Sequence, residues 1–183
     1  MLLNDFQIAT WANTGGMTPF KQDNLNPNSV DLTIGNEIAV EESNGQLSVI
    51  DIHLYSEGAP FYLCPEQFGL IKVAEYIDLS LPVFIEEFNF DGVFLTARAV
   101  GKSGRAREGL DLLNAGFAEA GYKGNLTLAV KNQRTRAVQA LWPGKRFAQL
   151  LLTPCRRPSN LYNGHYQGDT GVQPSRGHFT TNH

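Results

Sequence analysis

The chain has 183 residues, 42% of them hydrophobic and 18% charged, and its formal net charge is −3. This length suits one domain with a single core, and the negative charge gives no basic field that would hold a nucleic acid polymer. No segment approaches the roughly 18 uninterrupted apolar residues of a membrane helix, and the opening sequence MLLNDFQIATW lacks the basic region of a signal peptide. We therefore expect a soluble protein of the cytoplasm that does not associate with membranes.

The first predicted element is a short helix near the N-terminus. Asn4 or Asp5 supplies an N-cap, apolar residues follow, and Gly15 and Gly16 end the helix. The rest of the chain up to residue 157 reads as short strands, because apolar or alternating runs are separated by Gly, Pro and Asn. The predicted strands lie within residues 29–35, 37–42, 47–54, 60–65, 68–79, 93–100, 126–132, 137–142 and 147–154. Strands at this spacing indicate a sandwich, a jelly roll or a partly closed barrel.

Residues 158–183 differ in composition from the rest of the chain. They are rich in Gly, Asn, Ser and His and contain few apolar residues that could anchor them to a core. A segment of this kind cannot fold by itself. We therefore expect residues 1–157 to form one β-rich domain and residues 158–183 to form a flexible arm of that domain.

The segment VGKSGRAREGL, residues 100–110, contains the tripeptide GKS, which also occurs in phosphate-binding P-loops. The P-loop pattern requires a glycine five residues before Gly101, and Thr96 stands there, so the segment is not a P-loop. Lys102, Ser103 and Arg107 can still offer cations and a hydroxyl to a phosphate chain, and the glycines leave backbone N–H groups accessible. The alternative is a solvated basic turn without a ligand.

The cysteines and histidines give no support to zinc binding or to nucleophilic catalysis. Cys64 and Cys155 are far apart in the sequence and read as buried, reduced thiols. No zinc-ligand spacing and no Ser/His/Asp pattern involves the four histidines, which are His53, His165, His178 and His183. Gln149 is a different candidate, because it is the one polar residue of the apolar run FAQLLL. A buried amide needs partners, which are either groups of the protein itself or a ligand.

Five segments occur in an order and at a spacing that resemble a known enzyme family. They are NPNSVDLTIG (26–35), GKSGRAREGL (101–110), NAGFAEAGYKGNLTLAVKN (114–132), WPGKRFAQLLL (142–152) and YNGHYQGDTGVQPSR (162–176). Together they resemble the dCTP deaminase/dUTPase superfamily, and LLNDFQIATW at the start resembles its opening helix. The fifth segment and EYIDL (75–79) resemble the dCTP deaminase branch more than ordinary dUTPases.

The resemblance implies a fold, an assembly and a set of ligands. The subunit would be a distorted jelly roll of the dUTPase-like, β-clip type, and it would form a homotrimer with active sites between subunits. The ligands would be deoxynucleoside triphosphates, with dCTP or dUTP as substrate and dTTP as inhibitor. Mg²⁺ would be bound through the triphosphate, without zinc, and the C-terminal arm would close over the nucleotide as a lid.

The resemblance also assigns roles to individual residues. Ser103 and Arg107 match the Ser and Arg that contact the nucleotide, while Lys102 stands where the family usually has Arg, which keeps the charge but loses the planar fork. Glu119 stands where relatives have an Asp that meets the sugar 3′-hydroxyl and, in dUTPases, orients the hydrolytic water. The other implied contacts are Phe117 and Tyr122 as packing surfaces, Ala115 through its backbone, Gln149, and, in the arm, Tyr162, His165, Tyr166, Gln167 and Asp169. His165 replaces a common Lys, and Asp169 replaces a common Gln.

Ala129 is the clearest departure from the family pattern. Deaminases of this family carry a Glu there, which takes a proton from the water that attacks C4 of cytosine and passes it to the departing ammonia. General acid–base catalysis contributes typically ~10²–10⁴-fold, and Ala has no proton to transfer. We therefore expect a dCTP deaminase-type enzyme, converting dCTP and water to dUTP and ammonia, that is impaired at this step.

Three explanations of Ala129 stay open from the sequence. The first is an artificial replacement of the Glu. The second is a dUTPase-like diphosphohydrolase that releases pyrophosphate, since dUTPases also have an apolar residue at this position. The third is a non-catalytic relative that only binds deoxynucleotides. The second explanation must accommodate Glu119, whose side chain is one methylene longer than the Asp of dUTPases and would displace the attacking water.

Overall fold

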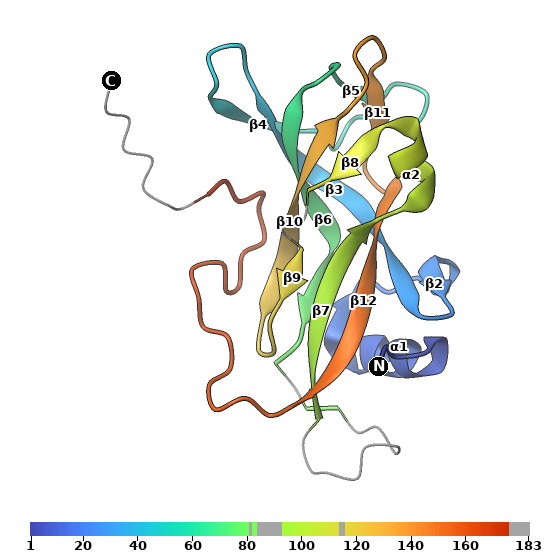
Figure 1. The fold of residues 1–183 in the computed structure, drawn as a ribbon, viewed down its shortest axis with the longest axis vertical. Coiled ribbons are helices and arrows are strands. Elements are labelled where there is room, and N and C mark those ends of the chain that lie inside the picture. The colour runs from blue at the N-terminus through green and yellow to red at the C-terminus, as the bar shows by residue number, and fades with distance from the viewer. Residues whose placement is uncertain (81, 84–92, 114–115, 176–183) are drawn as a thin grey trace.

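A computed structural model describes residues 1–80, 82–83, 93–113 and 116–175 (Figure 1). Within these residues, ten strands form one sheet whose main path runs β8–β10–β6–β3–β12–β7–β9. Off this path, β1 pairs with β6, while β2 and β4 pair with β3; β5 and β11 form a separate two-stranded sheet. The prediction of a mainly β fold with a short N-terminal helix is confirmed.

The helices are α1 (Asp5–Trp11) and α2 (Ser103–Glu108). The strands are β1 (Met17–Thr18), β2 (Leu25–Asn26), β3 (Ser29–Glu41), β4 (Leu47–Asp51), β5 (Phe61–Leu63), β6 (Phe68–Asp78), β7 (Val93–Gly101), β8 (Leu110–Leu112), β9 (Phe117–Ala118), β10 (Lys123–Asn132), β11 (Gln139–Leu141) and β12 (Arg146–Arg156). None of the described helices has the length and apolar character that a membrane crossing would require.

Strand β3 connects the two layers of the fold. Its first part pairs with β12, with Val30 opposite Leu150, and its second part pairs with β6, with Ile38 opposite Ile71. The register with β6 is irregular between Ile34 and Ile38, where the strand passes from one layer to the other. The layer β12–β7–β9 therefore lies against the layer β6–β10–β8, as in a distorted jelly roll (Figure 1). The core between them includes the fully buried Leu32, Ile34, Ile71, Leu95, Phe147 and Leu150.

Helix α1 closes one end of this core. Asn4 is its N-cap: the Asn4 side chain accepts a hydrogen bond from the backbone N–H of Gln7 at 2.9 Å, and the Gln7 side chain accepts one from the backbone N–H of Asn4 at 3.0 Å. This capping box satisfies N–H groups that the first turn of a helix leaves without partners. Ile8 and Trp11 point into the core, and the Trp11 indole donates to the carbonyl of Asp78 at 3.3 Å.

Helix α2 is the main local difference from the sequence prediction. The glycines of residues 101–109 favour a basic turn, but the structure has a helix there, because Arg105, Ala106, Arg107 and Glu108 are all good or moderate helix formers. Arg105 and Glu108 form an ion pair across one turn, with 2.5 Å between the charged atoms. Gly109 ends the helix with φ of 94°, a left-handed conformation that glycine adopts at low cost.

Residues 158–175, called the tail below, lie along β10 without forming a helix. In Figure 1 they leave the end of β12 and run past β9 and β10. Asp169 forms a parallel bridge with Gly124, and its carbonyl accepts a hydrogen bond from the backbone N–H of Asn125 at 2.8 Å. Val172 is buried against Ala39 and Leu70. The tail thus contacts the outer face of β10, β6 and β3.

Candidate functional site

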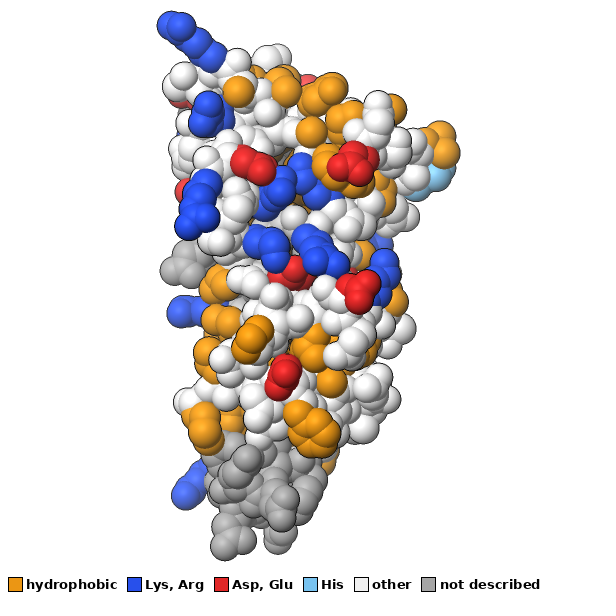
Figure 2. Space-filling view, turned by 90° about the vertical axis from the view of Figure 1, so that its right-hand side faces the viewer, with side chains coloured by type: hydrophobic (Ala, Val, Ile, Leu, Met, Phe, Trp, Pro, Cys, Tyr) orange, Lys and Arg blue, Asp and Glu red, His pale blue; other side chains and the backbone are white. Residues whose placement is uncertain are grey.

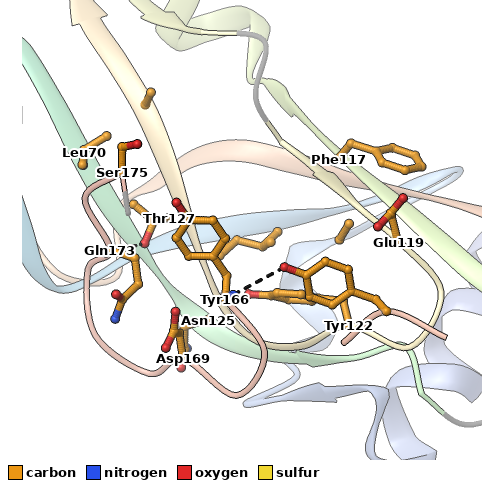
Figure 3. A pocket seen from close by; sticks show the side chains of 14 residues that line it. Leu70, Phe117, Glu119, Tyr122, Asn125, Thr127, Tyr166, Asp169, Gln173 and Ser175 are labelled. Atoms are coloured by element: carbon orange, nitrogen blue, oxygen red, sulfur yellow. Dashed lines mark hydrogen bonds between the residues drawn. The ribbon is translucent and has the colours of Figure 1, made fainter. Parts of the chain in front are cut away.

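A pocket of about 370 Å³ lies between β10, the turn that follows β9, and the tail (Figure 3). Thr127 and Ala129 line it from β10 because alternate residues of a strand face the same side, and Asn125 and Leu126 line it where the register with β6 is irregular. Leu128 and Val130, which face the other side, belong to the core. The pocket therefore unites two sequence segments, one around residues 117–129 and one in the tail, that are about forty residues apart.

Three tyrosines form the aromatic part of the pocket. Tyr122 is buried, and its ring centroid lies 5.9 Å from that of Tyr162, with the rings tilted by 56°. The backbone N–H of Tyr166 donates to the Tyr162 hydroxyl at 3.4 Å, drawn as a dashed line in Figure 3. Burial raises the pKa of the Tyr122 hydroxyl, and the neighbouring Asp169 carboxylate raises it further, so the phenol stays neutral at physiological pH. Aromatic rings at these positions suit a flat, weakly polar ligand.

Glu119 and Phe117 mark the open side of the pocket. The Phe117 side chain is 59% exposed, and Glu119 is exposed as well. The backbone N–H of Tyr122 donates to the carbonyl of Glu119 at 3.0 Å, which closes the turn between β9 and β10. Figure 3 shows Glu119 and Phe117 on one side of the pocket, with Asp169 and Gln173 on the other. The Glu119 carboxylate is thus placed where solvent and a ligand can both reach it.

Two glycines of this turn allow the tail to approach. Gly121 has φ of +98°, and a Cβ added to it would lie 2.7 Å from the backbone nitrogen of Tyr162. Gly124 has φ of +143°, and a Cβ there would lie 2.8 Å from the carbonyl oxygen of Asp169. Any other residue would be strained and would also push the tail away. The glycines beside Glu119 therefore serve the contact between the β9–β10 turn and the tail.

The predicted tail residues divide into two groups. Tyr162, Tyr166 and Asp169 line the pocket. Gln167 does not, because its side chain accepts a hydrogen bond from the backbone N–H of Lys123 at 3.0 Å and donates one to the carbonyl of Gly121 at 2.8 Å. Gln167 thus fastens the tail to the turn. His165 is exposed and is also not among the lining residues.

Ala129 faces the pocket from a largely apolar surrounding. It lies opposite Leu70 on β6 and packs against the cluster of Ala39, Leu70 and Val172. Because these neighbours carry no titratable group, nothing next to Ala129 in that cluster can transfer a proton in place of the missing carboxylate. The carboxylates that do line the pocket are Glu119 and Asp169.

A second polar group surrounds Asp31 on β3. The Asp31 side chain is only 2% exposed, and the Lys102 ammonium lies 2.6 Å from its Oδ2. Gln149 donates to Oδ1 at 3.2 Å, and the Arg146 guanidinium lies 3.8 Å from Oδ2. Gln149 is only partly buried, and its amide has a partner within the protein. Asp31 is absent from the predicted site residues, although a carboxylate inside the apolar strand SVDLTIG is a detectable signal.

Ser103 and Arg107 lie beside this group on α2, and both are exposed. Figure 2 views the face that carries α2, where Lys and Arg side chains gather around the middle of the molecule with a few acidic residues among them. Lys102, which directly precedes α2, is held by Asp31, so this part of the face has a fixed geometry. Cations and a hydroxyl in this arrangement can bind a phosphate chain.

The two groups do not meet within one chain. No residue of α2 lines the tyrosine pocket, and Figure 1 shows α2 on the side of the molecule opposite the tail. The predicted site residues Lys102, Ser103 and Arg107 are therefore separated from Glu119 and Ala129. Ala115, the remaining predicted contact, lies outside the described residues.

The two cysteines do not form a disulfide. Both cysteines are free thiols, but Cys64 is exposed and Cys155 is partly exposed, so the prediction of two buried thiols is wrong. Both lie near the ends of strands, where the alternation of inward and outward side chains is lost. In the part of the chain that the structure describes, no group of three or more His, Cys, Asp or Glu side chains is placed to hold a metal ion.

Comparison with known proteins identifies the family. The model of the dCTP deaminase-like family matches residues 2–155. The chain belongs to this family. It is 34% identical to a protein of Aquifex aeolicus named "dCTP deaminase, dUMP-forming", with 97% of this chain and 96% of the relative aligned. It is also 32% identical to a "Probable deoxyuridine 5'-triphosphate nucleotidohydrolase" of Sulfolobus islandicus rod-shaped virus 1, with 94% and 96% aligned.

A solved structure supports the fold of the dCTP deaminase family for this chain. The 2'-deoxycytidine 5'-triphosphate deaminase of Agrobacterium tumefaciens superposes with a TM-score of 0.62 at 19% sequence identity, over 82% of this chain and 48% of that chain. Asp31, Lys102, Ser103, Arg107 and Arg146 are called the α2 cluster below. The tyrosine pocket and the α2 cluster thus lie on one dCTP deaminase-like fold.

Proposed function

We propose that the chain is a cytoplasmic homotrimeric enzyme that hydrolyses a pyrimidine deoxynucleoside triphosphate, dCTP or dUTP, at sites between subunits. One observation carries this proposal: the cationic α2 cluster and the tyrosine pocket are chemically complementary parts of a nucleotide site, yet they lie on opposite sides of one subunit. A neighbouring subunit that brings its α2 cluster to this pocket would complete the site. Closed rings of identical subunits repeat such a contact at every interface.

Each half of the site fits a different part of the nucleotide. Aromatic rings and a largely apolar floor, with Tyr122, Tyr162 and Ala129, suit a base and a deoxyribose. Lys102, Ser103 and Arg107 suit the triphosphate, because Arg and Lys form short, charge-assisted hydrogen bonds with phosphate oxygens. The net charge of −3 gives no long-range attraction for anions, so the phosphates are held by this local cluster.

Mg²⁺ would enter the site bound to the triphosphate. Asp31, the buried carboxylate of the α2 cluster, is already paired with Lys102 and Arg146. The exposed cations and hydroxyl of α2 therefore fit the phosphate chain, and the metal would take its oxygen ligands from phosphates and water, as Mg²⁺ commonly does. When bound, it neutralises charge on the phosphates.

The residues favour hydrolysis at phosphorus over deamination. In the hydrolysis, the oxygen of a water attacks the α-phosphorus, the bond from that phosphorus to the bridging oxygen breaks, and pyrophosphate leaves. Glu119, exposed at the open side of the pocket, is the group that would orient this water and accept its proton. A nucleoside monophosphate, dUMP or dCMP, is the second product.

Deamination of dCTP is the second candidate, supported by the name of the Aquifex relative. That reaction adds water at C4 of cytosine and expels ammonia, which requires a group that moves protons beside the ring. Ala129 and its neighbours Leu70 and Val172 provide none. We therefore expect the chain to deaminate dCTP far more slowly than an enzyme with Glu at this position, by a factor on the order of 10²–10⁴.

Product analysis separates these reactions. The unaltered chain and the variants Ala129→Glu and Glu119→Gln are incubated with dUTP or dCTP and Mg²⁺, and pyrophosphate and ammonia are measured. We expect pyrophosphate from the unaltered chain, a loss of roughly 10²-fold or more in Glu119→Gln, and ammonia only from Ala129→Glu with dCTP. Release of ammonia by the unaltered chain at a rate above that of pyrophosphate would reverse the ranking of the two reactions. Nucleotide binding without either product from any variant would favour a non-catalytic binding protein.

A further inference from the structure

Asn125 is a pocket residue to which neither the sequence nor the comparisons give a role. It lies on β10 opposite Tyr76 of β6, and the register of these strands shifts between Asn125 and Thr127. Irregularities of this kind redirect side chains and often occur beside binding sites. Only 8% of Asn125 is exposed, and its side chain lines the pocket. Among the lining residues that carry an amide or a carboxylate, it is the only buried one.

The orientation of the Asn125 amide is fixed by β6. Its Nδ2 donates to the carbonyl of Val73 at 3.1 Å and to the carbonyl of Ala74 at 3.2 Å. Carbonyl oxygens only accept hydrogen bonds, so the nitrogen of the amide must face them and both of its hydrogens are used. The Oδ1 atom accepts no hydrogen bond from any residue in the described ranges. Oδ1 is not among the buried side-chain atoms that lack a partner, so this acceptor is accessible and can receive a hydrogen bond from a ligand in the pocket.

Asn132 on the same strand shows what a purely structural asparagine looks like here. It is fully buried, and its Nδ2 donates to the carbonyls of Leu63, Cys64 and Ala137 at 2.8–3.1 Å. Its Oδ1 accepts a hydrogen bond from the backbone N–H of Arg134 at 3.0 Å. Both ends of the Asn132 amide are therefore satisfied by the protein. Asn125 has the same kind of anchored nitrogen but an oxygen that is left for a ligand.

We propose that Asn125 recognises the base of the bound nucleotide, its Oδ1 accepting a hydrogen bond from an N–H group of the pyrimidine. The donor is N3–H of a uracil ring or N4–H of a cytosine ring, since both are N–H groups on the edge of a pyrimidine. This inference rests on the proposed function. The base is favoured over the sugar because Asn125 lies in the buried part of the pocket, whereas the exposed Phe117 and Glu119 mark the open side, toward which the triphosphate must extend.

The test uses nucleotides that lack the donor. Non-hydrolysable α,β-imido analogues of dUTP and dCTP are titrated against the full chain with Mg²⁺, beside the same analogues methylated at N3 of uracil or doubly methylated at N4 of cytosine. For the base that the site accepts, we expect methylation to weaken binding to the unaltered protein roughly 10- to 100-fold, because the hydrogen bond is lost and the methylated base covers an acceptor to which it cannot donate. In Asn125→Ala this penalty should shrink to about threefold or less, since no acceptor remains to be left without a donor.

Asn132→Ala is the matched control. It removes a buried amide from the same strand and should lower the melting temperature at least as much as Asn125→Ala, but the methylation penalty should stay as in the unaltered protein. The inference is overturned if methylated and unmethylated analogues bind the unaltered protein equally, a result that does not depend on any variant folding. It is also overturned if Asn125→Ala keeps the full penalty for both bases. Failure of the unaltered protein to bind any of the unmethylated nucleotides would instead contradict the proposed function on which the inference rests.

Discussion

Two buried carboxyl groups shape the strands that carry the site, and they are satisfied in different ways. Asp31 is paired with Lys102 and contacted by Arg146, so its charge is balanced by cations. Glu75, which is 2% exposed, has no cation in such contact among the described residues. Its carboxyl oxygens accept hydrogen bonds from the backbone N–H of Thr33 at 3.0 Å and from the Thr33 hydroxyl at 2.7 Å. Burial raises the pKa of Glu75, and the bonds from Thr33 only partly offset this effect.

Glu75 should therefore make the folded protein more stable in mild acid than at neutral pH. Because its pKa is raised on folding, its contribution is fully present below the ordinary value of 4.5 and is lost as the pH rises through the folded-state pKa. The variant Glu75→Gln cannot ionise, and its amide can still accept from the Thr33 N–H and donate to the hydroxyl. We expect its melting temperature to fall less than that of the unaltered protein as the pH rises above 4.5. The exposed Glu42→Gln is the control, and parallel curves for all three proteins would contradict the assignment.

At the scale of elements, the tail is held by apolar contacts of Tyr162 and Val172 and by a series of hydrogen bonds. Val172 is buried against Ala39 and Leu70, and its backbone N–H donates to Glu37 at 2.9 Å. The backbone N–H of Gln173 donates to the Thr127 hydroxyl at 2.9 Å. The tail therefore forms one wall of the pocket without adding a strand or a helix to the domain.

Replacing Val172 should release this part of the tail while the domain stays folded. Burying a valine side chain contributes roughly 1.5–3 kcal/mol, so we expect Val172→Ser to speed amide hydrogen exchange at Val172 and Gln173 about tenfold or more. The amides of the core strands should exchange as before. Val138→Ser is the control: it makes the same side-chain change at a position that is 48% exposed. It should change the exchange neither of the tail amides nor of the core amides. Unchanged exchange at Gln173 in Val172→Ser would show that Val172 does not anchor the tail.

The longer strands could be predicted from the sequence because they have their own alternation, although β3 is one strand where two were predicted and the short β1, β2, β8 and β9 lie outside the predicted strands. In residues 68–79, for example, Lys72 faces outward and Val73 inward. In residues 126–132, Thr127 faces outward and Leu128 inward. Helix α2 could not be predicted from the sequence, since the low helix propensity of its glycines hides a short run of helix-forming residues. The course of the tail was also beyond local patterns, because it depends on backbone hydrogen bonds and on close approaches at Gly121 and Gly124. Resemblance to the family indicated Glu119 and the tail tyrosines, but not Asp31 or Asn125, whose partners come from distant strands.

At the scale of the whole molecule, the residues of the proposed nucleotide site lie on two sides of the chain. The tyrosine pocket carries Glu119, and the α2 cluster carries Arg107. Sequence order gives no hint of this division, because the two residues are only twelve positions apart. The pairing of β7 with β12 and of β8 with β10 sends the chain around the core between them. A subunit alone would then have two incomplete sites, and activity would depend on assembly.

Complementation between inactive variants tests this division most directly. Arg107→Ala and Glu119→Gln are each assayed for pyrophosphate release from the preferred nucleotide, and are then co-expressed with different tags so that mixed assemblies can be purified. If each site combines α2 of one subunit with the pocket of the next, every closed trimer that contains both variants has one site out of three with both residues intact. We expect each variant alone to be nearly inactive and the purified mixed trimers to recover about one third of the unaltered activity. Mixed assemblies no more active than the better single variant, or an active protein that sediments as a monomer, would contradict a site shared between subunits.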